Sequence, residues 1–340
     1  MKAIYLRTAL LIGFIASLMA CGSGGNSKGN TEKKEVETYK STKYAGFTSS
    51  HVIAMQDSLL FLYNVEEDTT LPFHMREKDE IFNFKFDPDG RTMYYTVVRE
   101  GTLWLRKATF SDEGGTLEDL VNLNIPKEKC VSYLLDDRSP LEYKDGKLLL
   151  SSDFSWDTYD FSTYTIYNIA DNSLMTTRDR SKMEELFEVS YEPLGASFEV
   201  EEEQLIYKKN NQRYSLTDKL DLRLNNKYSS DENIEYFEAT FSPDGSKIAF
   251  VAIAEWGDLG VGPLCIADAD GKNQRILSED ATPYLIKLQW IGNSLFFIDA
   301  DEDPESESGT ALYSTDPDNG NARRRHFSDT KRFDIKQPAK

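Results

Sequence analysis

Short apolar segments separated by polar turns recur along most of the chain. Each segment holds a few residues rich in Leu, Ile, Val, Phe and Tyr, and each is bounded by Gly, Asp, Asn or Pro. Segments of this length and composition are typical of β-strands. The clearest predicted strands are 59–63, 93–98, 147–150, 205–207, 247–251 and 294–298. The pattern predicts one short helix at 181–187, where Asp179 or Ser181 can cap the first turn.

The turns before these strands recur along the chain. Their central positions are 57, 89, 145, 202, 244 and 292, so the gaps are 32, 56, 57, 42 and 48 residues, with a mean of 47. A period of about 40–50 residues is typical of a β-propeller, in which each blade is a four-stranded antiparallel sheet. Six turns therefore predict an all-β, six-bladed propeller. A seventh blade within 151–179 is the alternative, and the turn at 201–203 is the poorest copy.

Two of these turns share one chemistry. Asp87-Pro88-Asp89-Gly90 and Ser242-Pro243-Asp244-Gly245 each follow a phenylalanine and precede an apolar strand. Pro fixes φ, Asp binds nearby backbone and Gly accepts a positive φ, so both segments favour tight hairpins. The motif resembles the repeat of the TolB-like β-propeller family, and segments 101–105 and 263–271 resemble the third strand of that family's blade. The resemblance covers roughly residues 50–334 and implies protein partners in the bacterial envelope.

A ring of blades must also close, and pairing of strands from the two ends of the chain is the usual way to hide edge strands. The short aromatic segment 43–47 precedes the first turn by too few residues to form a blade. We expect it to supply the outer strand of the last blade.

The first twenty residues resemble a bacterial lipoprotein signal peptide. Two basic residues, Lys2 and Arg7, precede an apolar stretch. This stretch is shorter than the ~20 residues needed to span a bilayer. The sequence Leu18-Met19-Ala20-Cys21 fits a lipobox, so the resemblance implies cleavage before Cys21 and its acylation, with palmitate among the acyl chains. An ordinary secretory signal with an incidental cysteine is the alternative.

This resemblance divides the chain into four parts. Residues 1–20 are the signal peptide, 21–40 a Gly/Ser/Asn-rich tether from the lipidated cysteine, 41–334 the propeller and 335–340 a C-terminal tail. The expected location is the cell envelope, at the outer membrane, through a lipid anchor.

The charge balance narrows the choice of partners. The chain has 39 Lys and Arg against 58 Asp and Glu, a formal net charge of −19, which becomes −21 once Lys2 and Arg7 are removed. Nucleic acids are bound by clustered basic side chains, so this balance argues against them. The run Arg323-Arg324-Arg325 reverses the sign near the C-terminus. We expect a solvated segment, with contact to acidic loops of the same molecule or to an anionic envelope component as the alternatives.

The two remaining cysteines, Cys130 and Cys265, lie in apolar surroundings. We expect two buried, inert thiols, with a disulfide between them as the alternative.

Motifs for catalysis are absent from the sequence. The three histidines, His51, His74 and His326, show no metal-ligand spacing, and no nucleophile elbow or phosphate-binding loop occurs. We therefore expect no enzyme. A channel in which acidic side chains converged on His51 or His74 would reverse this expectation.

One acidic segment has the alternating oxygens of a calcium loop. Asp299, Asp301 and Asp303 are spaced two residues apart, which resembles the start of a Ca²⁺ loop, because a hard cation takes several oxygen ligands from one short segment. Pro304 and Thr310 stand where an EF-hand loop needs Gly and Glu, so a solvated acidic loop is the alternative, and no other cofactor is expected.

Large aromatic residues in two loops are candidates for a binding face. Trp156 and Tyr159 lie between acidic residues, and Trp256 lies in a Gly-rich loop. Such side chains anchor protein partners or stack on sugar rings. The sequence thus favours a binding or scaffold module for an envelope protein, with recognition of a glycan or peptidoglycan fragment as the alternative.

Overall fold

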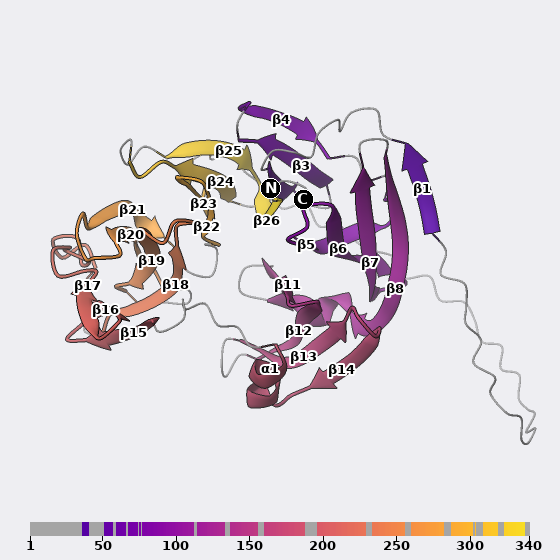
Figure 1. Cartoon of the computed structure of the whole chain (residues 1–340), viewed down its shortest axis with the longest axis horizontal. Coiled ribbons are helices and arrows are strands. Elements are labelled where there is room, and N and C mark those ends of the chain that lie inside the picture. Colours follow the sequence, from indigo (N-terminus) through magenta and orange to yellow (C-terminus); the bar gives the residue numbers. More distant parts are fainter. Residues whose placement is uncertain are drawn as a thin grey trace, which may run out of the picture. The chain divides into compact units, whose positions relative to one another are not determined.

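The computed structural model of the protein (Figure 1) describes residues 36–40, 51–56, 59–65, 67–73, 75, 77–111, 114–132, 137–155, 160–187, 196–228, 233–255, 260–281, 287–301, 303, 309–318 and 323–336. All of them belong to one compact unit, Lys34–Lys340. Within these ranges no helix is long and apolar enough to cross a membrane.

Seven antiparallel sheets occur in the described part of the chain, and six of them, with three to five strands each, form the blades. Blade 1 contains β5 (Glu80–Phe86), β6 (Thr92–Arg99), β7 (Thr102–Ser111) and β8 (Gly114–Pro126). Blade 2 contains β11 (Leu141–Lys144), β12 (Lys147–Ser155), β13 (Asp160–Asn168) and β14 (Ser173–Thr177). Blade 3 contains β15 (Ala196–Glu201), β16 (Gln204–Lys209) and β17 (Gln212–Ser215).

Blades 4 and 5 also consist of strands that follow one another in the sequence. Blade 4 contains β18 (Glu235–Phe241), β19 (Lys247–Ile253), β20 (Gly262–Asp268) and β21 (Arg275–Ala281). Blade 5 contains β22 (Gln289–Ile291), β23 (Ser294–Ala300), β24 (Thr310–Thr315) and β25 (Arg324–Ser328). A two-stranded sheet of β9 (Val131–Ser132) and β10 (Asp137–Arg138) lies between blades 1 and 2 in sequence.

The sixth sheet joins the two ends of the chain. This closing blade has the order β26-β2-β3-β4, with β26 (Thr330–Lys336) paired to β2 (His51–Gln56), followed by β3 (Leu59–Asn64) and β4 (Thr69–Pro72). Closure through both termini is therefore confirmed. The segment expected to provide it, 43–47, lies outside the described residues, and the outer position of the last blade is filled by β25 instead. That detail of the prediction was wrong because the C-terminal strand enters at the first position of the N-terminal sheet.

The first strands of the blades converge. β5 contacts both β11 and β26, and β26 contacts β22. The predicted turns at 89, 145, 202, 244 and 292 each join the first and second strands of blades 1 to 5. Position 57, outside the described residues, falls between the second and third strands of the closing blade, which explains the short first gap of 32 residues.

The fold is a six-bladed β-propeller, as the repeat predicted. The segment 151–179, where a seventh blade was the alternative, supplies β12, β13 and β14 of blade 2. Two blades depart from four strands: β1 (Val36–Lys40) adds a fifth strand to the outer edge of β8, and blade 3 has three strands in the described part.

The core lies between neighbouring blades. Apolar clusters pack the closing blade on blade 1, blade 1 on blade 2, blade 3 on blade 4, blade 4 on blade 5, and blade 5 on the closing blade. The largest buried side chains include Tyr95, Tyr167, Tyr207 and Tyr313. Because both faces of most sheets are covered, their second strands are apolar on both sides, which produced the continuous apolar runs in the sequence.

The short helix and the thiols match their predictions. α1 (Arg180–Leu186) begins at Asp179, whose carboxylate accepts a hydrogen bond from Lys182 N, and Met183 packs it on blade 2. Cys130, in the 3₁₀ turn η1 (Lys127–Cys130), and Cys265, in β20, are both buried and free. Burial raises the pKa of the Cys130 thiol to about 12.

Candidate functional site

The residues expected to bind a partner or carry a lipid lie outside the described part of the chain. These are Trp156, Tyr159, Trp256 and Cys21. Next to the first pair, Phe154 and Phe161 face each other across β12 and β13, with ring centroids 5.6 Å apart. Those two aromatic side chains therefore pack on each other within one blade.

The candidate calcium ligands contact arginines. Asp299 is buried at the end of β23, where its carboxylate lies 2.8 Å from Arg323 Nη1 and accepts a hydrogen bond from Ser278. Burial raises the pKa of Asp299. Asp301 makes two 2.8 Å contacts with Arg325, and Asp303 lies 3.4 Å from the same guanidinium.

These ion pairs give the acidic segment a structural role. Among the described residues no group of three His, Cys, Asp or Glu side chains is placed to hold a metal ion. Arg324 pairs with Asp68 at 2.5 Å, so all three arginines of the basic run contact acidic groups of the same molecule. The default expectation of a solvated segment therefore gives way to the alternative of contact with acidic groups of the same molecule.

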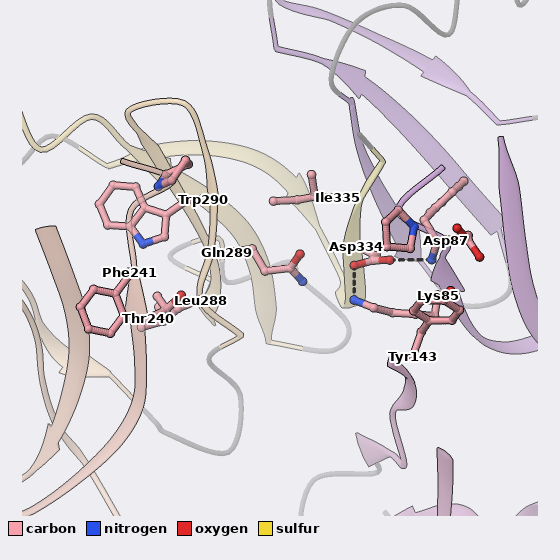
Figure 2. A pocket seen from close by; sticks show the side chains of 13 residues that line it. Lys85, Asp87, Tyr143, Thr240, Phe241, Leu288, Gln289, Trp290, Asp334 and Ile335 are labelled. Carbon is pink, nitrogen blue, oxygen red and sulfur yellow. Dashed lines mark hydrogen bonds and ion pairs between the residues drawn. The ribbon is translucent and has the colours of Figure 1, made fainter. Parts of the chain in front are cut away.

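A cavity of about 370 Å³ lies where the first strands of the blades converge (Figure 2). We call it the axial pocket. It is lined by residues at or near the C-terminal ends of β5, β11, β18, β22 and β26 and by the turns that follow two of them. The lining residues are Lys85, Phe86, Asp87, Pro88, Tyr143, Thr240, Phe241, Pro243, Leu288, Gln289, Trp290, Asp334 and Ile335.

One wall of the axial pocket is polar and charged. Asp334, on β26, is buried, and its two carboxylate oxygens accept hydrogen bonds from Lys85 Nζ at 2.6 Å and from Phe86 N at 2.8 Å. Figure 2 shows both contacts crossing from the closing blade to blade 1. The same carboxylate therefore holds the C-terminal strand to β5 and shapes the pocket.

Tyr143 and Asp87 complete this wall. Burial raises the pKa of Tyr143, and the negative charge of Asp87 and a hydrogen bond to it act in the same direction. The Tyr143 ring stacks on Tyr94 with centroids 5.9 Å apart, which fixes its position. Asp87 also accepts a hydrogen bond from Asp89 N at 2.9 Å within its turn.

The opposite wall is mainly apolar. Trp290, Phe241 and Leu288 lie together on this side in Figure 2, and Gln289 and Ile335 lie between the two walls in that view. Trp290 is only 7% exposed, yet its indole Nε1 has no hydrogen-bond partner within the described residues. The Nε1 atom itself has almost no accessible surface, so it is not open to the cavity.

The titratable residues of the lining are Lys85, Asp87, Tyr143 and Asp334. None of the thirteen lining residues is a His, Cys or Ser. His326 lies elsewhere, in β25, where its ring contacts Ser314 Oγ at 2.7 Å and packs on Tyr63. His74 lies outside the described residues, and His51 lies in β2.

The sequence analysis missed the axial pocket, although one signal pointed to it. Asp87, Pro88 and Pro243 belong to the two repeated turns, and turns that join the first and second strands lie at the same end of every blade. Residues just before those turns could therefore have been predicted to lie close together. Asp334 and Ile335 carry no such signal, because no copy of the repeated turn motif stands next to them in the sequence.

Comparison with known proteins adds little beyond the fold. No protein family matches the sequence, and none of the curated proteins matches it. A chain from the crystal structure of a nidogen/laminin complex is similar in structure, with 11% identity, a TM-score of 0.44 and coverage of 85% of this chain and 99% of that one. TolB from Acinetobacter baumannii is similar at 11% identity and a TM-score of 0.44, over 83% of this chain and 65% of TolB.

A third similar structure is an enzyme. The apo form of the AtxE2 isopeptidase shares 9% identity, with a TM-score of 0.45, over 86% of this chain and 55% of the isopeptidase. The chain thus spans about two thirds of TolB and about half of the isopeptidase. Identities and TM-scores this low carry no argument about function, and the assignment to the propellers rests on the topology of the six sheets.

Proposed function

We propose that the protein is a lipid-anchored binding propeller of the bacterial envelope, and that its axial pocket receives part of a protein partner. The observation that carries this proposal is the pocket itself, where strands of five blades meet around about 370 Å³. A ring of rigid sheets positions such a site well, because the side chains that line it come from strands and not from long loops.

The division of the pocket into two walls supports a protein partner. An apolar wall of Trp290, Phe241 and Leu288 suits an apolar side chain, and the polar wall around Lys85 and Asp334 suits a peptide group. Mixed apolar and polar linings of this kind are typical of sites that fix a ligand's orientation. Binding of a glycan was expected to use Trp156, Tyr159 and Trp256, which lie outside the described residues, so it stays the alternative.

A capture experiment tests the role of the pocket. The full-length protein is used to capture partners from native envelopes, alongside Ile335→Trp, which fills the pocket, and Leu59→Trp. Leu59 is 66% exposed on β3, so the second variant adds the same side chain to an open surface. We expect the wild type and Leu59→Trp to capture the same protein and Ile335→Trp to lose it. Equal capture by all three would refute the pocket as the site.

The anchor has its own test. Replacement of Cys21 by Ser should abolish labelling with radioactive palmitate and move the protein from the membrane fraction to the soluble periplasmic fraction. Retention of Cys21→Ser in the membrane fraction would contradict the lipid anchor and leave the binding role to be judged by the capture experiment.

A further inference from the structure

We infer that the ring opens between blades 2 and 3, and that this opening admits a segment of the partner to the axial pocket from the side. We call this junction the seam. The inference rests on the proposed function, since it concerns how the same pocket is reached. The side chains on the two blade faces at the seam carry it.

The other junctions of the ring are filled by buried apolar side chains. At the junction of blades 4 and 5, Val251 and Leu264 belong to one buried cluster with Phe297. Clusters of the same kind join the closing blade to blades 1 and 5, blade 1 to blade 2, and blade 3 to blade 4. In the part of the chain that the structure describes, no apolar cluster spans the seam. Since opening a junction exposes whatever fills it, the seam is the junction that opens at the lowest cost in buried apolar surface.

The face of blade 2 toward the seam is covered by a later part of the same chain. On β12, Leu148 and Leu150 pack in the cluster with blade 1, so Leu149 between them points to the opposite face. Leu149 packs there with Met183 of α1 and with Phe187, which directly follows the helix. Figure 1 shows α1 lying against the strands of blade 2. The apolar surface on this side of blade 2 therefore stays buried when blade 3 moves away.

The face of blade 3 toward the seam is mainly charged. The apolar face of this blade packs on blade 4, and the side chains that alternate with it point the other way. They form two ion pairs across neighbouring strands, Lys208 with Glu199 and Arg213 with Glu201, and these four side chains are 28–50% exposed. Ile206 lies among them and is buried. Separation of the two blades therefore uncovers chiefly charged side chains, which water solvates.

Blade 3 is also missing from the wall of the axial pocket. The described lining residues belong to blades 1, 2, 4 and 5 and to the closing blade, and none of them lies in β15, β16 or β17. Tyr143 of blade 2 and Thr240 of blade 4 line the pocket from the two blades that flank blade 3. The seam therefore leads to the side of the pocket on which no described residue of blade 3 closes it. A partner segment that enters there meets both walls without passing along the axis of the ring.

Spin labels test whether the seam opens. The full-length protein with Cys21→Ser receives nitroxide labels at Glu185→Cys on α1 and Glu199→Cys on β15, two exposed positions on opposite sides of the seam. Cys130 and Cys265 are buried and stay unlabelled. The distribution of distances between the two labels is measured by pulsed electron paramagnetic resonance.

The control pair spans a junction that apolar side chains fill. Ser246→Cys and Asn293→Cys place labels in exposed turns of blades 4 and 5. We expect the distance distribution of the seam pair to be at least about twice as broad as that of the control pair, because only the seam opens. Equal widths for the two pairs would overturn the inference.

A cross-link across the seam tests its role in binding. The cysteines of the seam pair are joined by a bis-maleimide whose length matches the shortest distance in the measured distribution, and those of the control pair are joined in the same way. We expect the protein cross-linked at the seam to retain at least about tenfold less of the partner that the wild type captures from native envelopes, while the cross-linked control captures it normally. Equal capture by the two cross-linked proteins would overturn the inference.

Failure of this inference differs from failure of the proposed function. If Ile335→Trp loses the partner while the seam cross-link does not, the pocket binds the partner but is not reached through the seam. If Ile335→Trp keeps the partner, the pocket is not the binding site, whatever distances the labels report.

Discussion

Replacement of Asp334 by Ala isolates the contact through which the C-terminal strand holds blade 1. The substitution leaves the buried N–H of Phe86 without its acceptor and Lys85 without its counterion. An unsatisfied buried donor costs about 1–3 kcal/mol. The Lys85 side chain is 32% exposed, so water solvates its ammonium group when the Asp334 carboxylate is removed. The lost ion pair therefore adds less than about 1 kcal/mol to the cost. We expect Asp334→Ala to lower the free energy of unfolding by about 1–4 kcal/mol.

Asp334→Asn separates the two parts of this cost. The amide oxygen still accepts from Phe86 N, while the charge that faces Lys85 is lost. We expect Asn to recover more than half of the stability that Ala loses, because the buried N–H regains its acceptor.

Urea unfolding followed by circular dichroism measures these effects as shifts in the midpoint at constant slope. The matched control is Glu184→Ala, which breaks an ion pair with Arg180 in which both side chains are more than half exposed. Exposed pairs contribute little, so the control should stay within about 1 kcal/mol of the wild type. The reasoning fails if Asp334→Ala is no more destabilising than Glu184→Ala.

Three further predictions concern packing, pH and thiol chemistry. Gly262→Ala would place a Cβ 1.8 Å from a carbonyl oxygen of β19, so we expect the free energy of unfolding measured in urea to fall by at least about 3 kcal/mol. The control Gly146→Ala places its Cβ in open space and should cost about 1 kcal/mol. Equal effects of the two substitutions would contradict the close approach at Gly262. Burial lowers the pKa of His326 to about 4, so the folded state binds fewer protons than the unfolded state between about pH 6.5 and pH 4. Stability should therefore fall as the pH drops through that window, by at most about 3 kcal/mol, and His326→Phe should lose this dependence; a parallel pH profile for the variant would refute it. With Cys21 replaced by serine, Cys130 and Cys265 should resist a thiol reagent at pH 8 until the protein unfolds, because burial raises both pKa values; rapid labelling of the native protein would contradict their burial.

Much of the fold could be predicted because its signals are local. The strand predicted at 247–251 lies within β19, and the turn after Phe241 joins β18 to β19 as its Pro, Asp and Gly require. The Asp244 carboxylate accepts hydrogen bonds from Ser246 N and from the Ser242 hydroxyl, which is the turn chemistry read from the sequence. Such signals depend on a few neighbouring residues, so they can be recognised in a single sequence.

The closing strand and the site could not be predicted in the same way. Ile335 pairs with Val52, almost the whole chain away, and nothing near either residue encodes that pairing. Trp290 and Asp334 meet around one cavity only because the ring is closed, and each alone resembles many other buried residues. The candidate ligands Asp299, Asp301 and Asp303 had a clear local pattern, but arginines from a later segment contact all three.

The order in which the closing blade is assembled has a consequence for synthesis. β2 is among the first propeller strands to be made, and its partner β26 follows all the other described strands. Until β26 has been made, β2 has a strand edge without its native neighbour, and such edges recruit other chains. Folding that depends on so distant a contact is slow, and its partly assembled forms are prone to aggregation. A cell that makes this protein must therefore keep nearly the whole chain from aggregating before the ring can close.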